Sequence, residues 1–363
     1  MNSLPRPSSA GWILLPLALL LTAASTFAQT PVGSFIHGKI QNFQQTSTTA
    51  PVADPVQPFQ FGSLVAMGTA TINSATLTFS GSASPRAYTG STSGDFSILD
   101  TFTTQAQLDA AYPTSTYNLA VNTTAGPFSK SISYFAFFGY PPTPRLTVPA
   151  ASWQNGAIVI DPTADYTLTW GAFTGAQATD AIQLAIAGSG LSLSPFPATQ
   201  TSYTIPAGSL QPNTNYACEL AFLRVAGATA ADANFGAGYA TLVRKTAFTI
   251  HTIAPALTLT AAASRKTHGT GTFDINLPLG STPGVECRSG GGTGDHTLVI
   301  GFSNPIATAT ANITGGTATV VSTAISGNTV TVNLTGVADV QTVTVTLSDI
   351  TDTFAQALPD IAI

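Results

Sequence analysis

The stretch Thr201–Val225, TSYTIPAGSLQPNTNYACELAFLRV, decides the fold class of this chain. In its first part Tyr203 and Ile205 alternate with polar neighbours, and Pro206–Asn213 then supplies residues typical of turns. In its second part apolar residues recur at every second position, which is the period of a strand with one buried face. These residues are Tyr216, Cys218, Leu220 and Phe222. The stretch therefore predicts strand, turn and strand, with a buried thiol at Cys218.

The spacing Leu210-x-Pro212-x-Thr214-x-Tyr216 resembles the E–F corner of fibronectin type III domains. In such a corner a tyrosine hydrogen-bonds back to the backbone and fixes the bend. The segment Leu168-Thr-Trp170 is similar to the second strand of that family, where a tryptophan packs in the core. The resemblance covers about a hundred residues, the usual size of such a domain. It implies a β-sandwich in which Trp170, Leu210, Pro212, Tyr216 and Cys218 have structural roles.

Two features depart from the fibronectin type III pattern. Arg224 falls on the strand face of Tyr216 and Phe222, where an apolar residue is expected. The segment Gly227–Gly238 is also longer than a tight hairpin needs.

Composition favours an all-β protein and excludes some classes of partner. Of the 363 residues, 44% are apolar and only 7% are charged, so disorder is excluded for most of the length. Few Lys and Glu residues with much Thr, Val and Ile favour strands over helices. The net charge of −5 gives no electrostatic reason to expect nucleic acid or an anionic membrane as a partner.

The N-terminus has the pattern of a secretory signal peptide, residues 1–28. Arg6 gives the positive region, Trp12–Leu21 the apolar region, and Thr26-Phe27-Ala28 a small-residue exit before Gln29. The alternative is a retained membrane anchor, but the apolar run is about half of the roughly 20 residues that a span needs. No cysteine follows it to suggest a lipoprotein. We expect a secreted or cell-surface protein with no membrane span in the mature chain.

We expect three consecutive β-sandwich-like domains after the signal peptide. The first, residues 29–145, is a β-sandwich or jelly-roll-like domain with one short helix that begins after Thr103 or Thr104 and stops at Pro113. A stiff proline-rich linker, Pro141–Pro144, follows it. The second domain, residues 146–252, is the fibronectin III-like one.

The third domain, residues 253–363, begins with the linker Ile253–Pro255. It resembles a bacterial immunoglobulin-like module of exported multidomain proteins. The resemblance depends on Phe302-Ser-Asn-Pro305, on the strands after it, and on the segment Val345–Asp352. Gly327-Asn328 is expected to turn a hairpin between two of these strands.

Catalytic and metal-binding signatures are weak, so we expect no catalytic residues, metal or other cofactor. The glycine-rich Gly290–Gly294 does not stand between a strand and a helix, as a phosphate cradle requires. The third domain holds four residues with metal-ligand or nucleophile chemistry, but without compact ligand spacing. They are His268, Cys287, Asp295 and His296. We interpret them as loop residues, with Cys287 partly packed beneath the glycine-rich turn and not bridged to Cys218.

Two pairs of aspartates suit calcium chemically but are better explained as turn residues that close strand ends. They are Asp349 with Asp352, and Asp161 with Asp165. The only glutamates are Glu219 and Glu286, and Glu219 should point outward from its strand, so a paired-carboxylate glycosidase is not expected.

Exposed aromatic rings are the remaining candidates for a ligand site, because flat apolar faces stack on sugar rings. The candidates are Trp153, Tyr140, Tyr88 and Phe138. The alternative is that these side chains fill domain cores or the first linker.

The sequence therefore favours an exported, non-catalytic structural or adhesive protein built from spacer or docking modules. The alternatives are carbohydrate binding by the N-terminal region, and an accessory subunit of a polysaccharide-degrading system. Polysaccharides or cell-surface proteins are the expected partners. The choice depends on analogy between folds.

Overall fold

The computed structural model describes residues 30–363 except 92–93, 136–138, 192, 194 and 281–282. The expected signal peptide and Phe138 lie outside the described residues. The described chain is all-β with one short α-helix, which confirms the predicted fold class. It forms two compact units, Met1–Ile253 and Ala254–Ile363. In the described part of the chain, no helix has the length and apolar character needed to cross a membrane.

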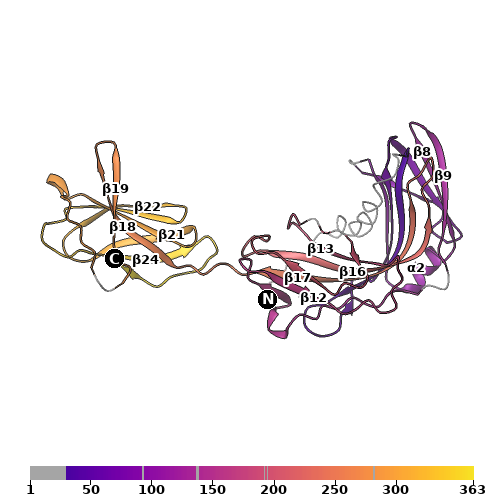
Figure 1. Cartoon of the computed structure of the whole chain (residues 1–363), viewed down its shortest axis with the longest axis horizontal. Helices are drawn as coiled ribbons and strands as arrows, with labels where there is room; N and C mark the ends of the chain where they lie inside the picture. Colours follow the sequence, from indigo (N-terminus) through magenta and orange to yellow (C-terminus); the bar gives the residue numbers. More distant parts are fainter. Residues whose placement is uncertain (1–29, 92–93, 136–138, 192, 194, 281–282) are drawn as a thin grey trace. The chain divides into compact units, whose positions relative to one another are not determined.

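The first unit is built on an eleven-stranded sheet in the order β14-β13-β16-β17-β1-β3-β7-β6 (Figure 1). Its strands are β1 (Val32–Gln44), β3 (Phe59–Met67), β6 (Thr89–Gly90), β7 (Phe96–Phe102), β13 (Ala181–Ile186), β14 (Phe196–Pro197), β16 (Asn215–Thr229) and β17 (Gly238–Thr252). Three short strands join it off this path: β2 (Val52–Ala53) on β1, and the pair β10 (Trp153–Gln154) and β11 (Ala157–Ile160) beside β17.

Two smaller sheets complete the first unit. One has the order β5-β4-β8-β9, made of β5 (Arg86–Ala87), β4 (Ile72–Thr78), β8 (Thr116–Thr123) and β9 (Gly126–Ser133). The other pairs β12 (Tyr166–Thr169) with β15 (Ser202–Ile205). Each contributes buried side chains to a separate core shared with the large sheet.

The large sheet contains strands from both sides of the domain boundary that the sequence predicts between residues 145 and 146. Strands β16 and β17 are 15 residues long, and opposite ends of each contribute to the two cores. Ala226 and Ala240 belong to the core with β4 and β8, which we call the first core. Phe222 and Phe248 belong to the core with β12 and β15, which we call the second core. The Gly227–Gly238 segment therefore begins and ends as a continuation of this hairpin into the neighbouring sandwich, and residues 230–237 form the loop that joins the two strands.

A polar seam separates these two cores and explains Arg224. Its guanidinium lies 5.5 Å from the centre of the Phe173 ring and 3.3 Å from the buried carboxylate of Asp180. It also donates to the carbonyls of Gly139 and Gly175. The linker crosses here, since Pro144 accepts a hydrogen bond from the Thr246 side chain. An arginine replaces the expected apolar residue because this position lies beyond the edge of the core.

The opposite face of the large sheet carries another buried apolar cluster. Its buried members are Ile36, Ile40, Leu64, Ala221, Leu223 and Val243. Because both faces of β1 are buried, its sequence lacks a clear alternation of apolar and polar residues.

The predicted helix is α2 (Gln105–Ala111), and it confirms the capping argument. The Thr104 hydroxyl accepts a hydrogen bond from the backbone N–H of Gln107, while the Gln107 side-chain oxygen accepts one from the backbone N–H of Thr104. This reciprocal capping box satisfies amide groups that a helix start leaves unpaired. Buried Leu108 and Ala111 attach the helix to the first core.

The second unit is a β-sandwich around its own core. One sheet has the order β19-β18-β20-β23-β22, and the other has β21-β24-β25. Their strands are β18 (Leu259–His268), β19 (Gly271–Asn276), β20 (His296–Phe302), β21 (Ile306–Gly315), β22 (Thr319–Ser326), β23 (Thr329–Thr335), β24 (Thr344–Asp352) and β25 (Ile361–Ala362). The two-residue turn Gly327-Asn328 joins β22 to β23 as predicted, with Gly327 at φ +54°.

Candidate functional site

The tyrosine corner predicted from the sequence is present. The backbone N–H of Gln211 donates to the Tyr216 hydroxyl at 2.7 Å, and the Tyr216 ring is buried. Leu210 is buried in the same core, and half-buried Pro212 lies in the bend between them. This set therefore fixes a chain reversal and does not present a binding group.

Trp170 and Cys218 are also core residues, as expected. Trp170 is 2% exposed, and its indole N–H donates to the carbonyl of Gln200 at 2.9 Å. Cys218 is buried and unpaired, and desolvation raises the pKa of its thiol well above the usual range. A thiol that stays protonated is a poor nucleophile.

The interpretation of Tyr88 as an exposed sugar-stacking residue is wrong. Its side chain is 7% exposed and belongs to the first core. Its hydroxyl lies 2.6 Å from the Ser63 hydroxyl, which lies 2.7 Å from Nδ1 of buried His37. The ring therefore fills a domain core, which is the alternative that the sequence left open.

Tyr140 and Trp153 are half-buried and lie against different cores. Tyr140 packs on the first core, and the Arg244 guanidinium stands 5.8 Å from its ring centre. Trp153 packs on the second core, and its buried indole nitrogen has no partner among the described residues. Tyr88, Tyr140 and Trp153 therefore do not form one aromatic platform.

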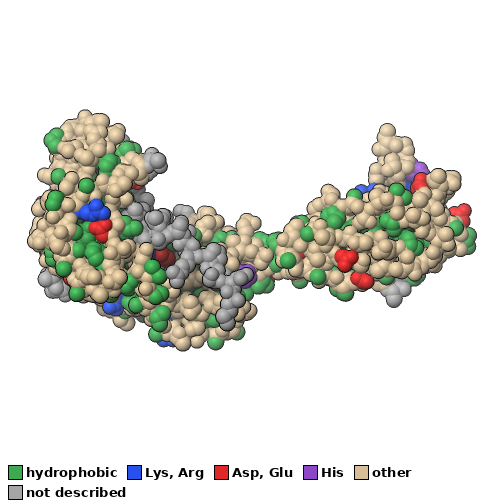
Figure 2. All heavy atoms as spheres, turned by 180° about the vertical axis from the view of Figure 1, so that it is seen from behind, with side chains coloured by type: hydrophobic (Ala, Val, Ile, Leu, Met, Phe, Trp, Pro, Cys, Tyr) green, Lys and Arg blue, Asp and Glu red, His purple; other side chains and the backbone are tan. Residues whose placement is uncertain are grey.

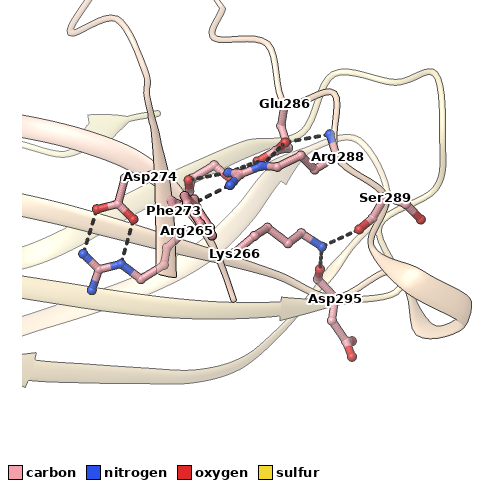
Figure 3. Close-up of polar contacts among 9 residues, drawn as sticks. Arg265, Lys266, Phe273, Asp274, Glu286, Arg288, Ser289 and Asp295 are labelled. Carbon is pink, nitrogen blue, oxygen red and sulfur yellow. Dashed lines mark hydrogen bonds and ion pairs between the residues drawn. The ribbon is translucent and has the colours of Figure 1, made fainter. Parts of the chain in front are cut away.

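A cluster of charged and polar groups in the second unit lies where the β18–β19 hairpin meets the loop before β20 (Figure 3). Arg288 donates hydrogen bonds to the Glu286 carboxylate from its Nε and Nη2 atoms, the latter at 2.7 Å. It also donates to the backbone carbonyls of Phe273 and Ser264. Burial opposes ionisation of Glu286, but hydrogen bonds from Arg288 and Ser264 outweigh it and lower its pKa to about 2. The site therefore contains a fixed ion pair at neutral pH.

Lys266 ties the glycine-rich loop to this cluster (Figure 3). Its ammonium donates to the carbonyls of Ser289 and Asp295, at 2.7 and 2.6 Å. The loop continues into strand β20 and not into a helix, so its backbone lacks the context of a phosphate cradle.

A cavity of about 560 Å³ opens beside the ion pair. Its polar wall includes Ser264, Glu286 and Arg288, and its apolar wall includes Leu298 and Leu334. This volume is in the range of pockets that hold small ligands. Its walls come from segments distant in sequence, and no local motif marks them.

Cys287 lines the cavity and is exposed, so the prediction that it packs beneath the glycine-rich turn is wrong. Half-buried His296 lines the cavity too, and desolvation lowers the pKa of its imidazole, with a smaller effect from the positive Lys266. Among the described residues, no three His, Cys, Asp or Glu side chains are placed to hold a metal ion.

The aspartate pairs have mainly turn-closing roles in this structure. Asp352 is buried, accepts from the amide of Asn304 at 2.8 Å and caps backbone N–H groups that follow it. Asp161 accepts from the backbone and hydroxyl of Thr163, and Asp165 accepts from the N–H of Ala207. Glu219 points away from the second core. On that other face of the sheet its carboxylate pairs with the Lys245 ammonium at 2.7 Å.

Comparison with known proteins leaves the family open. No family model matches the chain, and no curated protein matches it. Among solved structures, the FN1–FN3 domains of chicken CNTN1 are similar at 12% sequence identity and a TM-score of 0.18, over 93% of this chain and 99% of that chain. A TM-score of this size does not establish a common fold. The all-β assignment therefore depends on the strands and cores described above.

Proposed function

We propose that this chain is an exported, non-catalytic structural or adhesive protein whose β-sandwich units act as spacers and docking surfaces. The main support for a spacer role is that β16 and β17 run continuously through both sandwiches of the first unit. A spacer must keep its ends apart, and a shared sheet resists bending more than a flexible linker does.

The surface supports docking to neutral partners. Figure 2 shows few charged side chains between large areas of hydroxyl, amide and backbone atoms. On the outer face of β4, β8 and β9, uncharged side chains form cross-strand hydrogen bonds, such as Ser131 to Asn118 at 2.6 Å and Asn122 to Ser74 at 3.2 Å. Such a face fits a neutral, hydroxyl-rich partner, and salt should not screen the contact.

Two experiments test the proposal. The full chain is expressed with residues 1–28 in a secreting bacterial host, and we expect N-terminal sequencing of the exported protein to begin at Gln29. Beads coated with the mature protein are then tested under flow on neutral and anionic polysaccharides and on cell-surface protein extracts. We expect retention that persists in 1 M NaCl. The proposal would be overturned if the protein stayed inside the cell, or if the beads detached from every surface.

Carbohydrate binding in the second unit is the second candidate function, and the cavity beside Glu286 and Arg288 favours it. A charged pair can bond sugar hydroxyls while apolar walls contact the ring. Exposed Ala338 lines the cavity, so Ala338→Trp should fill it, whereas Ala324→Trp places the same ring on exposed strand β22. Polysaccharide binding lost only in the first variant supports the cavity, and equal binding by both variants contradicts it.

A further inference from the structure

The strands at the two ends of the described first unit are neighbours in its sheet. The described chain reaches the sheet at β1 and leaves it through β17, and these strands pair in parallel. The pairing runs without interruption over ten residues of each strand, from Phe35 beside Gly238 to Gln44 beside Ala247. This contact joins segments more than 200 residues apart, as the hydrogen bond from Thr241 to the carbonyl of His37 shows.

The parallel direction decides how tension acts on this ladder. Val32, at the start of β1, lies beside the start of β17, because its N–H donates to the carbonyl of Asn234 at 2.9 Å. The chain leaves at the other end, after Thr252. A force that separates the two ends of the unit therefore pulls β1 and β17 along their axes in opposite directions. Their hydrogen bonds run across the strands, so the whole ladder is loaded together.

We propose that the β1–β17 ladder is a shear clamp that lets the first unit carry tension along the chain. The inference rests on the proposed structural or adhesive function, since a spacer between two attached surfaces is under load. It adds the direction of that load and the contact that resists it. If the two strands were antiparallel, both pulled ends would lie at one end, and the bonds would open one after another.

Three further contacts reinforce the clamp. The bonds flanking the ladder, from Phe35 to Ala237 and from Gln45 to Ala247, measure 3.1 and 3.0 Å. The Arg244 side chain of β17 donates to Gln41 of β1 at 2.6 Å. On its other side β1 pairs with β3, so it must leave two neighbours to be extracted.

Burial protects the ladder from water. Most side chains of β1 between residues 35 and 40 are nearly inaccessible, including those of His37 and Lys39. Water cannot easily insert between the strands to replace a strained hydrogen bond. Strand β11 continues the same arrangement, since its residues 158–160 pair in parallel with residues 250–252 of β17.

Single-molecule pulling on the whole mature chain tests the clamp by changing only the direction of force. All molecules carry Cys287→Ser, which leaves buried Cys218 as the only native thiol. One sample is held by its two termini. The other is held by its N-terminus and by Ala233→Cys, an exposed position in the loop beside Val32. In the second geometry the force peels β1 from β17.

We expect the first unit to resist a several-fold higher force between its termini than in the peeling geometry. Its fully extended chain should have a contour length of about 75 nm, given roughly 3.4 Å per residue from Val32 to Thr252. Urea unfolding of the Ala233→Cys protein, equal to that of its parent, confirms that the fold is unchanged. Equal forces in the two geometries would overturn the clamp. That result is independent of bead adhesion, so it leaves the proposed function to its own test.

Discussion

Acid should destabilise the first unit through His37, whose imidazole is fully buried on strand β1. Its Nδ1 atom contacts Ser63, and its Nε2 atom has no partner among the described residues. The rings of Phe35 and Tyr117 lie 5.5 and 5.8 Å from it, measured between centres. Desolvation lowers the pKa of this imidazole from 6.5 to about 3. A group in this setting stays neutral in the folded protein throughout mild acid.

The sign of the effect follows from where the proton binds. Between pH 6.5 and about 3 the unfolded chain protonates His37 and the folded chain does not, so stability falls as the pH falls. Each pH unit in this window costs about 1.4 kcal/mol, and the free energy of unfolding should drop by about 2–3 kcal/mol from pH 7 to pH 4.5. Carboxylates with lowered pKa values, such as Asp232, add their own loss mainly below about pH 4.

Tryptophan fluorescence during urea unfolding isolates this effect. In the mature chain both tryptophans, Trp153 and Trp170, belong to the first unit, so the signal omits His296 of the second unit. The matched variant is His37→Gln, which keeps a polar side chain but has no proton to gain. We expect its free energy of unfolding to be nearly constant between pH 6.5 and 4.5. If the wild type shows the same slope as this variant, the reasoning about His37 is refuted.

Three further substitutions test the packing argument by urea unfolding at pH 7. Tyr216→Phe leaves the Gln211 N–H without its acceptor and should lower stability by about 1–3 kcal/mol; an unchanged midpoint would contradict a structural corner. Asp180→Ala leaves Arg224 half-buried without its carboxylate and should lower stability by about 3–5 kcal/mol, more than an exposed Asp→Ala control. Thr104→Ala removes the helix cap and should lower stability by about 1 kcal/mol, whereas Thr104→Ser should restore it.

Local patterns in the sequence predict the elements that local chemistry determines. The alternation around Tyr216 predicts a half-buried strand and its corner, and the Thr104 pattern predicts the cap of the helix. Trp170 is buried as its resemblance implies. In each case the interacting groups lie within a few residues of one another, or a strand period marks the buried face.

The shared sheet has no such local signal. The pairing of β1 with β17 joins segments about 200 residues apart, and His37 and Lys39 on β1 have side chains typical of a surface. Arg224 was the one anomaly that pointed to the seam, but its meaning depends on the linker that crosses there. The prediction that Tyr88 is exposed was wrong for a related reason. Composition says nothing of whether a ring such as Tyr88 faces solvent or a second sheet.

The same long-range pairing sets an order on folding. A chain that emerges from a ribosome or an export channel presents β1 first, and its parallel partner β17 arrives some 200 residues later. Until then β1 exposes an unpaired edge, and apolar side chains around it invite aggregation. The local hairpin of β16 and β17 can form quickly, whereas closing the loop back to β1 is slow. The final unit should therefore mature in a late step, and chaperones that shield β1 would decide how much of the protein reaches its folded form.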